Sequence, residues 1–114
     1  MSKSKLPLEF IIHAQIGDAI LNRVASDLIA DYSNGSKETN QLMLGVIKSN
    51  DFIKDWPPIL KVKFIDVNKL GSLQKTKIMG DIIEASISFL YLNRGIGAAE
   101  RYVKRNIINS LQKI

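Results

Sequence analysis

The stretch from Lys77 to Leu92 constrains the fold of this chain most, because it is apolar on almost every side. A surface helix carries one apolar stripe, whereas a helix that is apolar all round has to be enclosed by other elements. In a chain of 114 residues, 46% of them hydrophobic, the remaining segments must supply that cover. The stretch therefore predicts a central buried helix with the rest of the chain packed around it.

The segments available to cover it also have helical patterns. Apolar residues recur at helical spacing from Leu8 to Tyr32, and a second helical run from Glu38 to Ile47 follows a Ser-Lys-Glu start. Pro57-Pro58 ends the segment after it, and beyond the break at Asn93-Arg94-Gly95 a basic amphipathic helix runs from Gly97 to Lys113. We expect one all-α domain, a helical bundle of residues 1–114.

Each of these helices carries apolar residues that we expect to face inward. They are Ile12, Ile16, Ala19, Ile20, Val24, Leu28 and Ile29 in the first helix, Leu42, Met43, Val46 and Ile47 in the second, and Ala98, Tyr102, Val103, Ile107, Ile108 and Leu111 in the last. One segment departs from the helical pattern, since Ile59 to Val67 alternates as a strand would. A single strand cannot form a sheet, so we expect an extended connection or a helix there.

Composition excludes several classes of protein. The chain has no cysteine and a single histidine, His13, which excludes zinc-ribbon and thiol-redox sites and leaves His13 a structural role. No apolar window is long enough for a signal sequence or a membrane span, so we expect an intracellular, cytoplasmic protein without membrane contact. Residues 69–114 hold eight basic and three acidic side chains, the imbalance expected of a surface that meets phosphates. A solvated basic helix face is the alternative.

Two carboxylates, Asp81 and Glu84, lie three residues apart within the apolar helix, so they share one face. Their repulsion and desolvation would favour protonation unless a cation lay between them, and carboxylates are the ligands that magnesium prefers. The alternative is a capping box that follows Gly80, with Asp81 as N-cap and Glu84 three positions later. Asp18 could complete a carboxylate cluster, or it could be a solvent-facing residue beside a helix-packing Gly17.

Three segments in register resemble the ribonuclease III family over about 90 residues. The first is Ala14-Gln-Ile-Gly-Asp-Ala-Ile-Leu21, which is similar to the second half of that family's signature helix. The second is Val46-Ile-Lys-Ser-Asn-Asp-Phe52. The last comprises Lys77-Ile-Met-Gly-Asp-Ile-Ile-Glu-Ala85, Phe89-Leu-Tyr-Leu-Asn-Arg-Gly95 and Ala98-Ala-Glu-Arg-Tyr-Val103. The size of the chain and its Ile-Gly-Asp-Ala stretch are similar to the mini-ribonuclease III group, which lacks an appended double-stranded-RNA-binding domain.

The resemblance implies an all-helical, two-fold homodimeric endoribonuclease that hydrolyses phosphodiester bonds of double-stranded RNA in RNA processing. It implies magnesium, or manganese in its place, held by Asp18, Asp81 and Glu84 as catalytic and metal-binding residues. Without an appended RNA-binding domain, RNA would be bound by this domain's own side chains or with an accessory RNA-binding protein. The candidate RNA-binding residues are Lys75, Lys77, Asn50, Arg101, Lys104 and Arg105.

Two positions depart from the family pattern. Ala14 stands where the signature helix usually has a metal-ligand Glu, and Ile11 replaces an acidic residue further upstream. Because Asp18, Asp81 and Glu84 are retained, we favour an active enzyme. The alternatives are an inactive ribonuclease III fold that serves as an RNA-binding or ribosome-associated scaffold, and an unrelated helical interaction module.

Overall fold

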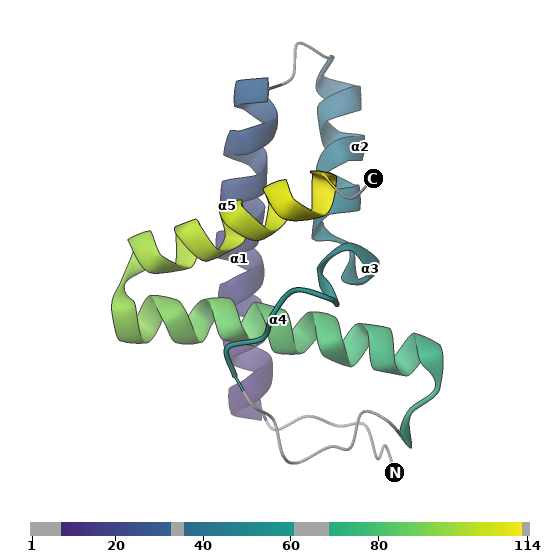
Figure 1. Ribbon diagram of the computed structural model, residues 1–114, viewed down its shortest axis with the longest axis vertical. Coiled ribbons are helices and arrows are strands. Elements are labelled where there is room, and N and C mark those ends of the chain that lie inside the picture. The colour runs from purple at the N-terminus through teal and green to yellow at the C-terminus, as the bar shows by residue number, and fades with distance from the viewer. Residues whose placement is uncertain (1–7, 33–35, 61–68, 113–114) are drawn as a thin grey trace.

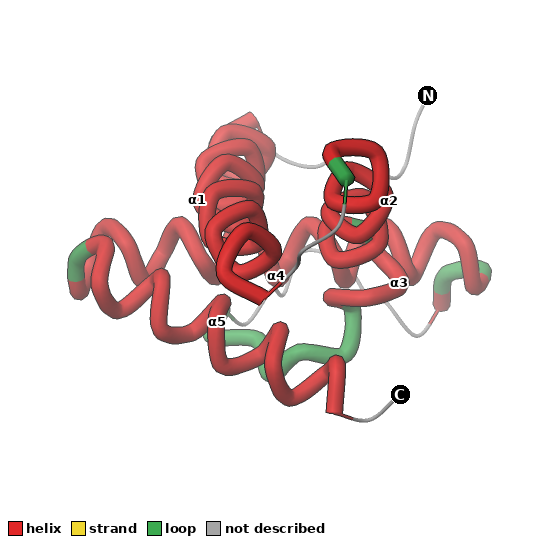
Figure 2. Tube along the Cα trace, turned by 90° about the horizontal axis from the view of Figure 1, so that it is seen from above, coloured by secondary structure: helices red, strands yellow, loops and turns green. Residues whose placement is uncertain are grey.

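The structure is a computed structural model that describes residues 8–32, 36–60 and 69–112, and these residues form five helices and no strand. The helices are α1 (Leu8–Tyr32), α2 (Lys37–Lys48), α3 (Asn50–Ile53), α4 (Ser72–Arg94) and α5 (Ile96–Gln112). In Figure 1, α1 and α2 run alongside each other while α4 and α5 lie across them, and Figure 2 shows the same crossing with α1 and α2 seen end-on. The all-α prediction is confirmed.

Serine caps and a glycine with positive φ mark several of the helix ends. Ser36 caps α2 by accepting a hydrogen bond from the Thr39 amide at 3.2 Å. Ser49 terminates α2 and starts α3, because its hydroxyl donates to the Val46 carbonyl at 2.7 Å and accepts from the Phe52 amide at 3.3 Å. Gly95 separates α4 from α5 with a φ of 88°, a conformation in which a residue with a Cβ is strained. The break predicted there is confirmed.

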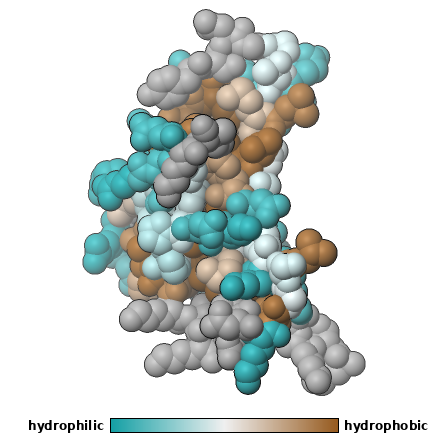
Figure 3. All heavy atoms as spheres, turned by 45° about the vertical axis from the view of Figure 1, so that its right-hand side comes forward, coloured by the Kyte–Doolittle hydropathy of each residue, from teal (hydrophilic) through white to brown (hydrophobic). Residues whose placement is uncertain are grey.

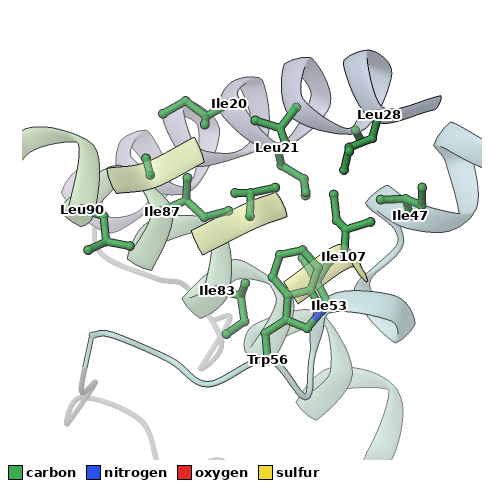
Figure 4. Packing of buried hydrophobic residues seen from close by; sticks show 14 of the residues in the cluster. Ile20, Leu21, Leu28, Ile47, Ile53, Trp56, Ile83, Ile87, Leu90 and Ile107 are labelled. Carbon is green, nitrogen blue, oxygen red and sulfur yellow. The ribbon is translucent and has the colours of Figure 1, made fainter. Parts of the chain in front are cut away.

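Helix α4 is the centre of the molecule, as its apolar sequence predicts. It contacts α1, α3 and α5, and Ile83 and Ile87 within it are fully buried. Figure 4 shows these two side chains pointing into a cluster that α1, α2, α3 and α5 complete. The other labelled members of this cluster are Ile20, Leu21, Leu28, Ile47, Ile53, Trp56, Leu90 and Ile107.

Two serines on α4 are also fully buried, and both have hydrogen-bond partners. The Ser86 hydroxyl donates to the Ile82 carbonyl at 2.8 Å and accepts from the amides of Ile59 and Leu60, each at 3.1 Å. Ser86 thus fixes the start of the segment for which an extended connection or a helix was expected. Ile59 and Leu60 belong to no helix or strand, and residues 61–67 of that segment lie outside the described part of the chain.

Several apolar side chains expected to face inward are exposed instead, and on these the sequence prediction was wrong. Leu42 is 74% exposed and Val46 59%, because no described element covers that side of α2. The others are Ile12, Ala19, Met43 and Leu111. Some of them border an apolar groove of about 390 Å³ between α1, α2 and α5. Figure 3 shows apolar side chains running along the upper part of one face of the molecule, flanked by hydrophilic ones.

Candidate functional site

The candidate site lies where α1 crosses α4. At the crossing, Gly17 lies directly against the main chain of Glu84, and a Cβ at position 17 would overlap the Glu84 carbonyl group. Only glycine permits this approach without a shift of one helix. The contact brings Asp18, the next residue on α1, beside the Glu84 side chain, so the helix-packing role considered for Gly17 and the carboxylate pairing considered for Asp18 are both present.

The side chains of Asp18 and Glu84 share a hydrogen bond, which requires a proton between the two carboxyl groups. Burial, the hydrogen bond to Asp18 and the negative charges of Asp18 and Asp81 together raise the pKa of Glu84 from 4.5 to about 9, and burial is the largest of these causes. The charge of Lys48 opposes this rise. The pair is therefore a half-buried acidic site that holds a proton in the absence of a cation.

Asp81 lies one turn before Glu84 in the interior of α4. Since α4 begins at Ser72 and its N-cap is Gly71, the interpretation of Asp81 and Glu84 as a capping box is wrong. Burial raises the pKa of Asp81, and the positive charge of Lys77 works against that rise. Asp81 therefore needs another reason for its place in a largely apolar helix, and its charge adds to the negative potential around Glu84.

The junction of α2 and α3 packs against α4 beside this site. Gly80, the residue before Asp81, has no side chain, and the Asn50 side chain occupies the space that a Cβ would fill. Asn50 was predicted to bind RNA, and the structure gives it an intramolecular packing contact with α4. Two residues earlier, Lys48 is half-buried and acts electrostatically on Glu84. Lys48 was missed by the sequence analysis, although it lies in a segment that carries the family resemblance.

The other predicted RNA-binding residues lie on two surfaces. Lys75 and Lys77 are exposed on the first two turns of α4, upstream of Asp81. Arg101, Lys104 and Arg105 are exposed on α5, a separate helix. The two α4 lysines share a helix with the carboxylates, so they stand closer to the site along the chain.

His13 has the structural role expected of it. Its Nδ1 atom lies 3.1 Å from the hydroxyl oxygen of Ser88, and this contact joins α1 to α4. His13 lies about one turn before Gly17 on α1, and Ser88 lies about one turn after Glu84 on α4. This polar contact sits on the side of the crossing away from Asp18 and helps to hold the two helices in register.

The pair of Asp18 and Glu84 is a better candidate site for a hard divalent cation than a cluster of three carboxylates that includes Asp81. In the part of the chain that the structure describes, no three acidic or histidine side chains meet in an arrangement that could hold a metal ion. Magnesium is usually bound through one or two carboxylates, with water and substrate phosphate completing its octahedron. Asp18 and Glu84 supply two such carboxylates, and the proton they share marks where a cation would relieve their repulsion.

Comparisons with known proteins agree with the resemblance. No protein-family model and no solved structure matches the chain. Two curated proteins do, ribonuclease 3 from Mycoplasmoides gallisepticum strains R(high / passage 156) and R(low / passage 15 / clone 2), each 31% identical over 102 residues. The match covers 86% of this chain and 15% of each relative, so the chain spans a small part of their length. No described helix is long and apolar enough to cross a membrane. Over most of its own length, this chain is therefore a homologue of ribonuclease 3.

Proposed function

We propose that residues 1–114 form one ribonuclease III-type catalytic domain, a magnesium-dependent endoribonuclease that hydrolyses phosphodiester bonds in double-stranded RNA during RNA processing. The observation that carries this proposal is the hydrogen-bonded pair of Asp18 and Glu84 at the α1–α4 crossing. Apposed, half-buried carboxylates are costly without a cation, and a ribonuclease 3 homologue has a catalytic use for one.

In this mechanism Asp18 and Glu84 hold the metal ion, for which manganese can substitute. When bound, the ion neutralises negative charge on the phosphate and lowers the pKa of a bound water. Glu84 has to lose the proton it shares with Asp18 before both carboxylates can bind the ion. Asp81, one turn away, would act on the site through its negative charge, which raises the pKa of Glu84.

Binding of the RNA duplex falls to the basic residues. Lys75 and Lys77 would meet phosphates of the cleaved strand, while Arg101, Lys104 and Arg105 on α5 would contact a more distant part of the duplex or assist an accessory RNA-binding protein. An A-form helix is recognised chiefly through phosphates and 2′-hydroxyl groups, so we expect little sequence preference and a steep dependence on salt.

A homodimer is supported by apolar side chains left exposed on α1 and α4 near the point where the two helices cross. Leu8, Ile11 and Ile12 are 73%, 37% and 47% exposed on α1, and Phe89 and Leu92 are 40% and 58% exposed on α4. A pocket of about 290 Å³ lined from both helices, by His13, Phe89 and Leu92 among others, connects the two rows. An apolar surface of this kind on a small domain is typical of a protein contact.

The oligomeric state can be tested by light scattering after size exclusion. We expect Leu92→Glu to convert a dimer into a monomer, whereas Leu73→Glu, at a position on α4 that is 88% exposed, leaves the dimer intact. A wild-type protein that is monomeric at all concentrations would remove the dimer from the proposal.

The activity is tested by incubating the protein with a labelled RNA duplex of about 30 base pairs at low salt. Parallel reactions contain magnesium, manganese or a chelator. We expect metal-dependent cuts that leave short 3′ overhangs and that are abolished by Glu84→Gln and by Asp18→Asn. Asp27→Asn removes an exposed acid from α1, the helix that carries Asp18, and is the matched control. This variant should cleave the duplex normally.

The scaffold alternative has one structural observation in its favour. Ala14, at the position of the missing signature Glu, is only 8% exposed, so this part of α1 is used for packing. Duplex binding without cleavage in magnesium and in manganese would support the scaffold and refute the enzyme.

A further inference from the structure

The bend at Ser49 between α2 and α3 holds Lys48 near the acidic site. Ser49 closes α2 and opens α3 with the same hydroxyl group, so the residues on either side of it are fixed relative to each other. On one side, the Asn50 side chain is packed against Gly80, immediately before Asp81. On the other side stands Lys48, which is half-buried and whose charge acts on Glu84 of α4. The bend therefore presents an ammonium group to the site from a third element, after α1 and α4.

The net charge of the groups around the crossing would be balanced by one divalent metal ion together with one phosphodiester. Asp18, Asp81 and Glu84 supply three negative charges when ionised, and Lys48 and Lys77 are the cations that act on Glu84 and Asp81 respectively. These five groups leave one net negative charge. A divalent cation together with a singly charged phosphodiester would bring the site to neutrality, which is the condition under which both are retained in a partly buried environment.

Lys48 forms no ion pair of 4.0 Å or less with another described residue. Within the described residues, the ion pairs shorter than or equal to 4.0 Å join Arg23 to Glu100 and Lys54 to Asp51. Lys54 is thus the lysine that stabilises α3 locally, through Asp51 at 3.5 Å. Lys48 lies near enough to Glu84 to act on its charge, yet its ammonium group remains available to a ligand.

We propose that Lys48 binds a non-bridging oxygen of the phosphodiester that is cleaved beside Asp18 and Glu84. A lysine ammonium binds phosphate as a point charge with three donors, and it does not need the planar geometry of arginine. In the hydrolysis, a P–O bond forms to water, which gives up a proton to solvent, while the ester P–O bond breaks and the leaving oxygen takes a proton from solvent. Negative charge grows on the non-bridging oxygens meanwhile, and a fixed ammonium group stabilises it.

This inference rests on the proposed function for its catalytic part, so the test includes measurements that need no cleavage. Lys48→Met removes the charge and keeps much of the stem, and Lys48→Arg keeps the charge. Lys37→Met is the matched control, because it removes an exposed lysine from the opposite end of the same helix α2. Thermal melts verify that each variant is folded.

The first measurement is the affinity of the RNA-free protein for Mn²⁺, read from the spin-resonance signal of the free ion. Removing a cation from beside Glu84 should tighten Mn²⁺ binding about threefold or more in Lys48→Met. The second is duplex binding in Ca²⁺ over a range of salt, where loss of one phosphate contact lowers the slope of log K against log salt by about one. We expect neither effect in Lys37→Met.

The third measurement is single-turnover cleavage at saturating magnesium, which Lys48→Met should slow about tenfold or more, with partial recovery in Lys48→Arg. Unchanged cleavage and an unchanged salt slope in Lys48→Met would overturn the inference while wild-type cleavage still supported the enzyme. A tighter Mn²⁺ affinity with an unchanged salt slope would also overturn it, since Lys48 would then act on the metal alone. If the wild type binds duplex without cutting it, the proposed function fails, and a lower slope still assigns Lys48 to phosphate.

Discussion

Replacement of Gly17 by alanine should destabilise the protein although alanine favours helices. A Cβ at this position would lie 2.9 Å from the Glu84 Cα and closer still to the Glu84 carbonyl group, whereas carbon atoms in contact are normally about 3.5 to 4.0 Å apart. The obstacle is main chain, so no side-chain rotation relieves it and α1 must move away from α4. Overpacking of this kind costs about 1 to 3 kcal/mol and the alanine returns up to about 1 kcal/mol of helix propensity.

Because the overlap is with main chain, we take the upper end of that range, so the expected net loss for Gly17→Ala is about 2 kcal/mol, or about 8 °C in Tm for a chain of this size. Gly45→Ala is the matched control, because nothing lies within 4 Å of a Cβ at that exposed position of α2. It should raise the Tm by up to about 4 °C through helix propensity alone. Thermal melts in chelator, followed by circular dichroism and by the fluorescence of the single tryptophan, Trp56, measure both variants. If Gly17→Ala melted at or above the wild-type temperature, the close α1–α4 contact would be refuted.

Three further predictions concern polar groups near the core. Without divalent metal, the folded protein keeps the Glu84 proton up to a pKa of about 9 while the unfolded chain loses it near 4.5. The free energy of unfolding should therefore fall as pH rises between these values, and melts in chelator should show that Glu84→Gln flattens the decline. Ser86→Ala leaves two backbone amides without their acceptor, so in urea unfolding it should cost about 2 kcal/mol, more than Ser88→Ala, which removes a single side-chain contact. Tyr102→Phe deletes the 2.8 Å hydrogen bond to the Pro57 carbonyl and should cost about 1 kcal/mol in the same assay; no loss would mean that water replaces the hydroxyl.

Features that depend on local sequence were predictable. The bounds of α1, Leu8 to Tyr32, follow from apolar spacing together with Pro7 before the helix and Asn34-Gly35 after it, and the central position of α4 follows from its apolar sequence. The start of α4 was not found, because its first turn is polar except for the exposed Leu73 and its N-cap, Gly71, makes no side-chain hydrogen bond. That missing signal is what made a capping box at Asp81 plausible.

Features that depend on which helices meet could not be predicted from one sequence. The apolar spacing of α2 is the same whether Leu42 faces a core or solvent, and only the tertiary arrangement decides it. The place of Lys48 beside Glu84 likewise arises from the docking of the α2–α3 bend on Gly80. In contrast, Asp18 and Glu84 were recognisable because acids in apolar helices need a physical reason.

The two carboxylates of the site are 66 positions apart in the chain, and no short segment can bring them together. Their encounter requires a long loop to close, which is among the slower and more entropically costly events of folding. On the ribosome, α1 emerges with Asp18 well before the residues of α4 have been made. A nascent chain thus lacks the acidic pair while its own messenger and the structured RNA of the ribosome are nearby. Under the proposed function, the order of the elements along the chain delays nuclease activity until synthesis of the domain is nearly finished.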